Sequence, residues 1–526
     1  MLSHDGRYAI VYNGEVFNYR ELRQELRSYG YEFLGTSDTE VVLAAFQEWG
    51  TDSFSRFNGM WALAIWDMRE NRLILSRDRF GIKPLYYSVK KGAIVFASEM
   101  KFIMELVEDS FDPNPDAAAE YVDWARVSHS QQTFWKDIEE LEPGCFAVYM
   151  SGSIILRRYW NFEPSLEKWT TDEAVERFAE IFTDSLKLRM RSDVEVGSLL
   201  SGGLDSSLIV CELDRLGLIG TAPFQSFSAV FDEERFSEQR FAAQVVERTG
   251  IIPHYVTPTP KGLLDELDEL LWHIEEPFRS ASVYSQNLLY RRVRSASDVI
   301  VLLNGQGGDE LFGGYTHHYY HFITQLIATG RWIAALREIL MFTRQRNVSL
   351  RRVASITRSE LPSAKGAGDG YFNAVTFREL RESALREYLK YDDRNSMAYS
   401  LEARVPFMDY RLVEFAFSLP VDLKIRKSEN KRLVREYARG RVPEGVRSRK
   451  DKMGFVSPQE LWQRQELLDE FRNLYRKVEE KRTSDLVLQF VDKDRLYRYV
   501  VGSTNDWAYA WRVFCLDRWC EVSGIS

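Results

Sequence analysis

The stretch from Val194 to Gly217 reads VEVGSLLSGGLDSSLIVCELDRLG, and it decides which class of fold we expect. An apolar strand runs into a Ser-Gly-Gly turn, and a helical segment follows immediately. In this arrangement the backbone N–H groups of the turn and of the helix N-terminus point into one concavity, which suits an anion. Gly202 and Gly203 allow the backbone to approach that anion closely, because a Cβ would clash there. The turn is therefore predicted to bind a pyrophosphate group.

Polar side chains on the same turn strengthen this prediction. Ser201, Ser206 and Ser207 add hydroxyl donors, although the Lys of the kinase-type phosphate loop is missing. A tight strand-to-helix turn with a capping Ser and a first-turn acid is the alternative. Asp205 favours the phosphate site, because an acid beside a phosphate is explained when Mg²⁺ lies between them.

A second glycine-rich loop follows the apolar strand DVIVLLN and reads GQGGDELFGGY from Gly305 to Tyr315. The carboxyl ends of parallel strands meet at one edge of a sheet, so we expect both loops at that edge. Asp205 and Asp309 are then predicted to share one Mg²⁺ on the phosphates of a nucleotide. A loop of structural glycines with solvated acids is the alternative.

Strands and helices alternate from about residue 172, which predicts a parallel sheet with helices on both faces. The strand-like runs include FQSFSAVF and PHYVTPT, and beyond residue 320 the pattern is mostly helical. The first 160 residues instead carry short β-like runs and two helices, NYRELRQELRSYG and SDTEVVLAAFQEWG, each opened by a capping-box signal. We therefore expect an α+β domain over residues 1–160, a linker, and an α/β domain with a helical extension over residues 172–526.

The composition excludes several classes of protein. A length of 526 residues predicts two to four domains. A net charge of -9 argues against nucleic acid or an anionic membrane as a general partner. No apolar run approaches the ~18 residues of a membrane span. Four cysteines without a CxxC pair indicate a reduced, cytoplasmic protein.

Several motifs, in this order, resemble those of the glutamine-hydrolysing asparagine synthetases. SGGLDSS, GQGGDELFGGY, SLEARVPFMD at residues 400–409 and KMGF at residues 452–455 resemble the synthetase domain. YNGEVFNYRELR, SDTE and RDRFGIKPLYY resemble the class II glutamine amidotransferase domain. The resemblance spans nearly the whole chain. It implies two domains. The first is an incomplete sandwich like that of the N-terminal nucleophile hydrolases, and the second is an α/β ATP-pyrophosphatase domain of the adenine nucleotide alpha hydrolase-like type. Family members often form homodimers.

The resemblance also implies a reaction. ATP adenylates the β-carboxylate of aspartate and releases pyrophosphate, and ammonia then displaces AMP to form asparagine. ATP and Mg²⁺ are the implied cofactors, and aspartate with glutamine or ammonia are the implied small-molecule partners. Charge builds on the phosphates, so a cation should face them, and Lys452 matches the family lysine in this role; a surface Lys in the basic run RSRKDK is the alternative. The residues implied to bind ATP are Leu200, Ser201, Gly202, Gly203, Asp205, Ser206, Ser207, Ala229, Asn304 and Gly305.

Two positions depart from the synthetase pattern. Gln306 stands where most members have an acid, and a Gln amide can neither take a proton nor hold an amine through a charge. Arg279 also replaces an acid, and an Arg there could pair with a substrate carboxylate. The acceptor is therefore expected to be aspartate, while a different carboxylate is the alternative.

The glutamine site retains four matches but lacks its nucleophile. Asn13 and Gly14 match the oxyanion-hole pair, while Glu15 and Asp38 match groups that hold the α-amine of glutamine. An Asn-Gly hairpin turn and a first-turn helix acid are the alternatives. Residue 2 is Leu where the family has Cys. We expect a chain that begins at an internal Met and that uses ammonia rather than glutamine, while a truly inactive amidotransferase domain is the alternative.

Two other functions stay open at this point. A related synthetase of the β-lactam synthetase or lasso-peptide cyclase type would adenylate another carboxylate, which the missing Cys and Gln306 favour. A non-catalytic nucleotide-binding protein would lack turnover, which Asp205, Asp309 and Lys452 oppose.

Two further features are weak signals. His317 and His321 are spaced i, i+4 on a predicted helix, and without a third ligand in sequence they are a poor zinc site. Trp507, Trp511 and Trp519 near the C-terminus are predicted to pack as core.

Overall fold

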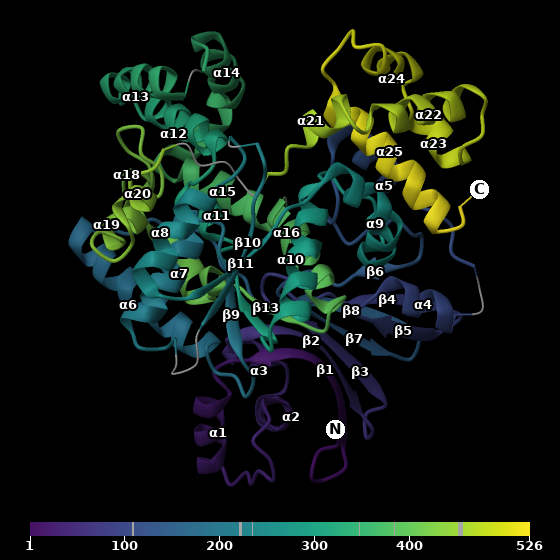
Figure 1. The fold of residues 1–526 in the computed structure, drawn as a ribbon. Coiled ribbons are helices and arrows are strands. Elements are labelled where there is room, and N and C mark those ends of the chain that lie inside the picture. Colours follow the sequence, from purple (N-terminus) through teal and green to yellow (C-terminus); the bar gives the residue numbers. More distant parts are fainter. Residues whose placement is uncertain are drawn as a thin grey trace.

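The computed structural model describes residues 1–107, 110–219, 224–233, 235–346, 348–382, 384–450 and 456–525. Figure 1 shows an N-terminal, strand-rich part beneath a central parallel sheet, with helices on both sides of that sheet and two helical groups above it. No helix within these ranges is both long enough and apolar enough to cross a membrane.

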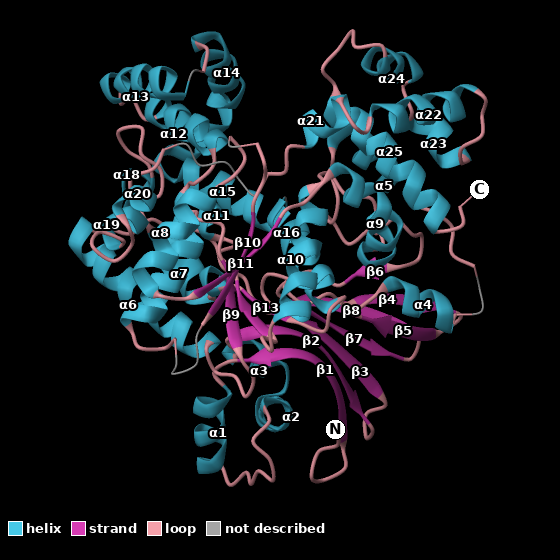
Figure 2. Cartoon of the chain, viewed as in Figure 1, coloured by secondary structure: helices cyan, strands magenta, loops and turns pink. Residues whose placement is uncertain are grey.

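Five parallel strands form the central sheet, drawn in magenta in Figure 2. Their order across the sheet is β11 (Ile252–Val256), β10 (Gln225–Ala229), β9 (Val196–Leu199), β12 (Val301–Leu303) and β13 (Glu402–Arg404). Because β9 and β12 are parallel neighbours, the two glycine-rich loops leave the same edge side by side. The predicted parallel sheet is confirmed, while β13 was not foreseen, because its sequence Glu-Ala-Arg has no apolar run like the one that contains β12.

Helices cover both faces of this sheet, as the alternating pattern predicts. α7 contacts β9 and α8 contacts β10, whereas α10 contacts β10 and β11, and α16 contacts β13. The helices around the sheet are α6 (Thr171–Arg189), α7 (Leu204–Arg215), α8 (Gln239–Thr249), α9 (Pro260–Ile274), α10 (Ser282–Ala296), α11 (Gly308–Phe312), α16 (Ala384–Met397), α17 (Tyr410–Ser418), α18 (Val421–Lys424), α19 (Arg432–Tyr437) and α20 (Glu444–Arg447).

The N-terminal part is a sandwich of two antiparallel sheets. The first sheet has the order β1 (Tyr8–Val16), β2 (Gly59–Asp67), β3 (Arg72–Arg77), β7 (Cys145–Met150) and β8 (Ser153–Arg158). The second has the order β5 (Ala93–Ala97), β4 (Tyr86–Lys90) and β6 (Glu139–Glu140). Alternate residues of β2, β3 and β7 pack against Leu85 and Tyr87 between the sheets. The outer faces are covered by α1 (Tyr19–Ser28) and α2 (Asp38–Trp49) on one side, and by α4 (Met100–Leu106) and α5 (Pro115–Trp124) on the other. The α3 helix (Ser53–Arg56) precedes β2.

Two helical groups complete the chain (Figure 1). One consists of α12 (Thr316–Ala328), α13 (Trp332–Arg346), α14 (Leu350–Ala367) and α15 (Tyr371–Glu382). The other consists of α21 (Gln459–Arg464), α22 (Leu468–Glu479), α23 (Asp485–Phe490), α24 (Lys493–Val500) and α25 (Trp507–Val522). On α25, Trp511 and Trp519 are fully buried and Trp507 is partly buried against the same cluster, which confirms that this helix packs as core.

The two predicted capping boxes are wrong. Asn18 makes no side-chain cap on α1, and Glu21 instead forms an ion pair with Arg191, at the end of α6. Ser37 does cap α2, by accepting from the N–H of Thr39, but Glu40 accepts from the N–H groups of the preceding loop. Each of these two acids instead interacts with groups that lie outside its own helix.

Buried polar contacts join the N-terminal sandwich to the parallel-sheet part. The Asp409 carboxylate is fully buried, accepts from Asn58 Nδ2 at 2.8 Å and pairs with Arg189 at 3.1 Å. Burial alone would raise the pKa of Asp409, but hydrogen bonding by Arg411 and the charge of Arg189 lower it to about 2. A second buried ion pair joins Lys83 to Asp393 on α16 at 2.8 Å.

Replacing Asp409 is expected to destabilise the chain strongly. In Asp409→Ala the Arg189 guanidinium stays buried without its carboxylate, so the free energy of unfolding should fall by about 3–5 kcal/mol. Urea unfolding followed by tryptophan fluorescence measures the change. The matched control is Arg177→Ala, which breaks the exposed Arg177–Glu180 pair and should cost less than about 1 kcal/mol. Equal losses in the two variants would contradict this account.

Candidate active site

The two glycine-rich loops lie in direct contact at the carboxyl edge of the parallel sheet. A Cβ on Gly308 would lie 2.6 Å from Cγ of Asp205, and one on Gly305 would lie 2.9 Å from the backbone N of Ser206. Distances below about 3 Å leave no room for a methyl group, so both positions require Gly. The predicted meeting of the loops at one edge is therefore confirmed, and the glycines are the reason that they can meet.

The first loop has the form expected of an anion site. Gly202 has φ +76°, and a Cβ there would lie 2.8 Å from the backbone N of Ala242. Gly203 precedes α7 and provides no side-chain cap, which leaves the helix N-terminus to another acceptor. The Ser201 and Ser206 hydroxyls lie 3.1 Å apart and interact with each other. Ser207 is fully buried, and its Oγ has no hydrogen-bond partner within the described ranges.

A lysine lies between the two predicted metal ligands. Lys431 Nζ contacts the carboxylate of Asp205 and lies 2.5 Å from Oδ1 of Asp309. The lysine is almost fully buried, and its backbone is held at φ 52°, a left-handed conformation that is uncommon for a non-glycine residue. The two acids were predicted to meet and they do, but the cation between them here is the Lys431 ammonium. No local pattern in SENKRLVRE had indicated this residue.

The second loop is tied to α16 behind it. Asn304 Nδ2 donates to Asp392 Oδ2 at 2.9 Å, and the N–H of Gln306 donates to Asn304 Oδ1 at 3.1 Å. Burial raises the pKa of Asp392 to about 6, although hydrogen bonds from Tyr290 and Asn304 oppose this. Gln306 itself is half-buried at the loop. Asp392 is a positioning residue that the sequence did not reveal, because it lies on a distant helix.

The proposed adenine side lies at the neighbouring strand β10. The N–H of Leu200 donates to the carbonyl of Phe227 at 2.9 Å, and the carbonyl of Leu200 accepts from the Ser228 hydroxyl. Ala229 is the last residue of β10 and is partly exposed at the same edge. The Leu200 backbone is therefore already engaged with β10, while Ala229 ends the strand beside it.

The basic segment after α20 reaches the first loop. Arg449 Nη1 donates to the carbonyl of Gly202 at 3.3 Å, pairs with Glu238 at 2.6 Å and stacks over Phe241 at 4.0 Å. Lys452, predicted as the phosphate-facing lysine, lies outside the described residues. Arg279 was predicted to be able to pair with a substrate carboxylate, and in the structure it forms an ion pair with Glu387 at 2.8 Å.

The four predicted glutamine-site residues lie on β1 and at the start of α2. Asn13 Nδ2 donates to Ser98 Oγ at 3.1 Å, and Asp38 Oδ2 accepts from the Tyr12 hydroxyl at 2.7 Å. Gly14 lies opposite Trp61 within the β1–β2 ladder, and a Cβ there would lie 2.1 Å from the carbonyl oxygen of Met60. The alternative interpretation of Asn13-Gly14 as a hairpin turn is therefore wrong.

Glu15 links this region electrostatically to the parallel sheet. Burial, together with the negative charges of Glu402 on β13 and of Asp38, raises the pKa of Glu15 to about 7. Glu402 pairs with Arg404, whose guanidinium also donates to the carbonyl of Arg189 at 2.8 Å. The candidate glutamine-site acid thus faces the edge strand of the sheet that carries both loops.

None of the four cysteines is exposed. Cys145 lies on β7 in the core between the two antiparallel sheets, and burial raises the pKa of its thiol. It therefore has neither the exposure nor the lowered pKa of a nucleophile.

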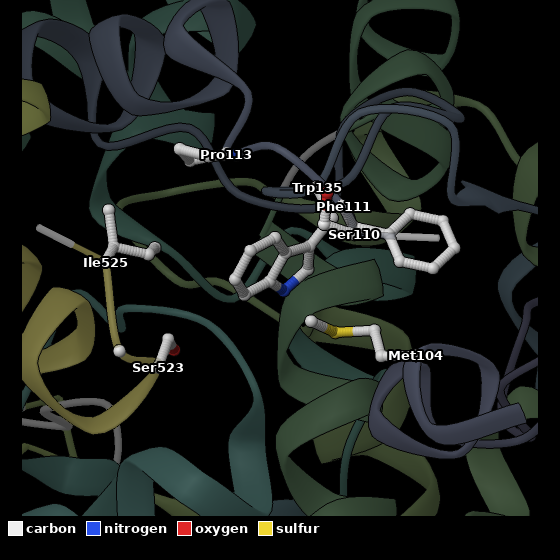
Figure 3. Close-up of a pocket in the computed structure, with 8 residues that line it drawn as sticks. Met104, Ser110, Phe111, Pro113, Trp135, Ser523 and Ile525 are labelled. Atoms are coloured by element: carbon white, nitrogen blue, oxygen red, sulfur yellow. The ribbon is translucent and has the colours of Figure 1, made fainter. Parts of the chain in front are cut away.

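A separate pocket lies between α4, the loop after it and the C-terminus, and Figure 3 shows its lining side chains. Its volume is about 410 Å³. No residue of either glycine-rich loop lines it, and the lining carries no side chain that titrates near neutral pH; it consists of Met104, Ser110, Phe111, Pro113, Trp135, Ser523, Gly524 and Ile525. It therefore lacks the groups that acid–base or phosphoryl chemistry requires.

Comparison with known proteins covers almost the whole chain. The family model described as asparagine synthase matches residues 177–521, and the one described as glutamine amidotransferase domain matches residues 1–160. The glutamine-hydrolyzing asparagine synthetase 1 of Bacillus subtilis (strain 168) is 30% identical over 534 residues, which cover 93% of this chain and 82% of that protein. A putative glutamine-hydrolyzing asparagine synthetase of Mycobacterium bovis is 31% identical over 87% of this chain and 76% of its own length.

Similarity to a solved structure is weaker. The glutamine phosphoribosylpyrophosphate amidotransferase from B. subtilis complexed with ADP and GMP aligns with 58% of this chain and 63% of its own at 16% identity. The TM-score is 0.23, which is too low to establish a shared fold.

Removing the Lys431 ammonium is expected to destabilise the loops. In Lys431→Met two close carboxylates lose a buried cation, so the free energy of unfolding should fall by about 3–5 kcal/mol. Adding Asp309→Asn removes one of the two repelling negative charges and should recover part of the loss. Urea unfolding of the two single variants, Lys431→Met and Asp309→Asn, and of the double variant gives the coupling between the two positions. The control is Arg472→Met, which removes the cation from an exposed pair with Asp469, whose side chains are 53% and 82% exposed, and it should cost less than about 1 kcal/mol. A loss as small in Lys431→Met would contradict the assignment.

Glu15 is expected to make stability depend on pH. The pKa of Glu15 in the folded chain, about 7, lies above the ordinary 4.5. Between these pH values Glu15 is mostly ionised in the unfolded chain but mostly protonated in the folded chain, so the free energy of unfolding falls as pH rises. Glu15→Gln should therefore raise the thermal midpoint at about pH 8 and leave it nearly unchanged at about pH 4. Calorimetry at both pH values measures this, with the exposed Glu176→Gln as control for net charge. The same shift at both pH values would rule out the raised pKa.

Proposed function

This chain belongs to the asparagine synthase family, and we propose that it converts aspartate to asparagine in an ATP-dependent reaction with a β-aspartyl-AMP intermediate. The observation that carries the proposal is the contact between the two loops, which brings Asp205 and Asp309 to one cation beside an uncapped helix N-terminus. A free helix N-terminus favours a phosphate group, and carboxylates placed beside it can hold the Mg²⁺ that accompanies substrate phosphates.

In the proposed site the nucleotide lies along the carboxyl edge of the parallel sheet. Ser201, Gly202, Gly203, Ser206 and Ser207 surround the pyrophosphate. Asn304 and Gly305 contact the nucleotide from the second loop, and Leu200 and Ala229 flank its adenine. The Asn304 hydrogen bond to Asp392 supports this role, because it fixes the start of the second loop against α16.

Asp205 and Asp309 would hold Mg²⁺ at this site. The donor set fits, because Mg²⁺ takes oxygen ligands and is commonly bound by one or two carboxylates together with substrate phosphates. When bound, the ion would stabilise the negative charge of the phosphates. Lys431 already meets the need for positive charge between the two carboxylates, which supports the view that this place is built for a cation.

The proposed chemistry has two steps. A β-carboxylate oxygen of aspartate bonds to the α-phosphorus of ATP, and the bond from that phosphorus to the pyrophosphate oxygen breaks. The nitrogen of ammonia then attacks the acyl carbon and loses one proton, while the carbon–oxygen bond to AMP breaks. Lys431 and Lys452 would face the charge that develops in the first step, and Gln306 would lie beside the acceptor without acting as a base.

We propose free ammonia as the nitrogen source for this chain. Asn13, Gly14, Glu15 and Asp38 would form the floor of a glutamine pocket, but all four cysteines are buried elsewhere, so none can attack the glutamine amide. The ionised form of Glu15 would be favoured by a bound ammonium group, because a neighbouring positive charge lowers the pKa of an acid.

The organisation of the chain belongs to the same proposal. The amidotransferase part spans residues 1–160 and the synthetase part spans residues 172–526, a division supported by the two family matches. A cytoplasmic location, pairing of two copies and the lack of nucleic-acid or membrane partners complete the proposal.

The test is pyrophosphate release from ATP in the presence of Mg²⁺ and aspartate, with ammonium, with glutamine or with no nitrogen donor. We expect asparagine, AMP and pyrophosphate in equal amounts with ammonium, and little product with glutamine. No pyrophosphate with aspartate and ammonium would overturn the proposal. Release with another carboxylate instead of aspartate would reassign the acceptor.

Site variants separate catalysis from folding. Asp309→Asn and Lys452→Met are each expected to lower kcat by at least about 100-fold, because each removes charge stabilisation from the transition state. Lys450, two residues before Lys452, is exposed, so Lys450→Met is the matched control and should retain full activity. Equal activity of the two lysine variants would assign Lys452 to the solvated surface instead.

A further inference from the structure

Three histidines and two glutamates gather on the helices that follow the second loop. His317, His318 and His321 lie at the start of α12, Glu360 lies on α14, and Glu379 lies on α15. Both partner helices pack against α12, in the upper left helical group of Figure 1. The i, i+4 histidine pair seen in the sequence therefore does find further ligand groups, from helices that are distant in the chain.

One oxygen of Glu379 faces two imidazole nitrogens. Oε2 lies 3.4 Å from Nε2 of His317 and 3.3 Å from Nε2 of His318. Two ligands of a tetrahedral Zn²⁺ with bonds of about 2.0–2.1 Å lie about 3.3–3.4 Å apart, so both distances match neighbouring ligands of one ion. A ligand atom from each of the three residues lies within 4.8 Å of the other two. His317 is 52% exposed, so its ring has room to close the remaining gap by rotation.

The other oxygen of Glu379 is held by a chain of hydrogen bonds. Nε2 of His321 lies 3.1 Å from Oε1 of Glu379, and Nδ1 lies 2.9 Å from Oε2 of Glu360. The Tyr371 hydroxyl donates to the same oxygen of Glu360 at 3.0 Å. An ionised carboxylate only accepts, so both nitrogens of His321 donate in this arrangement and His321 is not itself a ligand. Hydrogen bonds of this kind orient a carboxylate that binds a metal ion.

One of the two histidines, His318, is also packed into place. His318 is 2% exposed and lies against the ring of Phe372, with ring centroids 6.1 Å apart. The ring of Tyr315 stacks on His317 at 5.3 Å with an interplanar angle of 14°. A buried imidazole and a hydrogen-bonded carboxylate form a more rigid site than surface histidines would.

We propose that His317, His318 and Glu379 form a binding site for Zn²⁺, with water in the fourth position. Two imidazoles and one carboxylate suit a first-row transition ion, whereas Mg²⁺ prefers oxygen ligands. The site is therefore chemically distinct from Asp205 and Asp309. The ion joins α12 to α15 directly and to α14 through His321 and Glu360.

Calorimetric titration of the chelator-treated, full-length chain with Zn²⁺ tests this site, with excess Mg²⁺ present to occupy oxygen-rich sites. We expect one Zn²⁺ per chain and a higher thermal midpoint when the ion is bound. His317→Ala and Glu379→Gln should each weaken binding by at least about 100-fold, and Glu360→Gln, which removes only an orienting contact, by about 10–100-fold.

The control is His129→Ala, which breaks an isolated contact between His129 and Glu120 and should leave Zn²⁺ binding unchanged. Because His317 is half exposed, metal-free His317→Ala should keep the thermal midpoint of the metal-free wild type, so lost binding cannot be attributed to misfolding. Zn²⁺ binding that is no tighter in the wild type than in His317→Ala would overturn the proposal. These readouts need no ATP, so they stand apart from the proposed ligase activity.

Discussion

At the carboxyl edge of the parallel sheet, the two glycine-rich loops are in direct contact. This contact brings Asp205 and Asp309 close together at low exposure, where two negative charges repel unless a cation lies between them. Lys431, which lies 226 positions after Asp205 in the sequence, supplies that cation. The surrounding helices must therefore hold the start of α19 against the sheet edge. The glycines at positions 305 and 308 allow this closeness, since any side chain would separate the loops.

The α16 helix connects this site to the N-terminal sandwich. Asp392 accepts from Asn304 at the second loop, while its neighbour Asp393 pairs with Lys83 of the sandwich. The negative charge of Glu402 on the edge strand β13 contributes to the raised pKa of Glu15, so the two parts also interact electrostatically. A buried ion pair contributes little net stability, but removing one partner is costly, which makes such pairs determinants of geometry. The two candidate sites are thus held in one fixed relation by a few charged contacts.

The histidine cluster lies just beyond the same loop. Tyr315 ends the loop, stacks on His317 and donates through its hydroxyl to Glu310 at 2.7 Å. Burial and the charge of Asp309 raise the pKa of Glu310 to about 7.

Much of the fold and part of the site could be predicted from the sequence alone. The alternation of apolar strands and helices predicted the parallel sheet, and the SGG and GQGG turns predicted that two glycine-rich loops meet at one of its edges, because these signals are local in the chain. Only the tertiary structure decided that Lys431 lies between the acids, that Asp392 supports Asn304 and that Glu379 meets His317. The structure also shows that Glu21 and Glu40 interact with other groups than those of the predicted capping boxes. Apart from Glu40, whose partners are the nearby N–H groups of Leu34 and Gly35, each of these outcomes depends on which polar side chains meet across long sequence separations. Packing determines that, whereas local propensity does not.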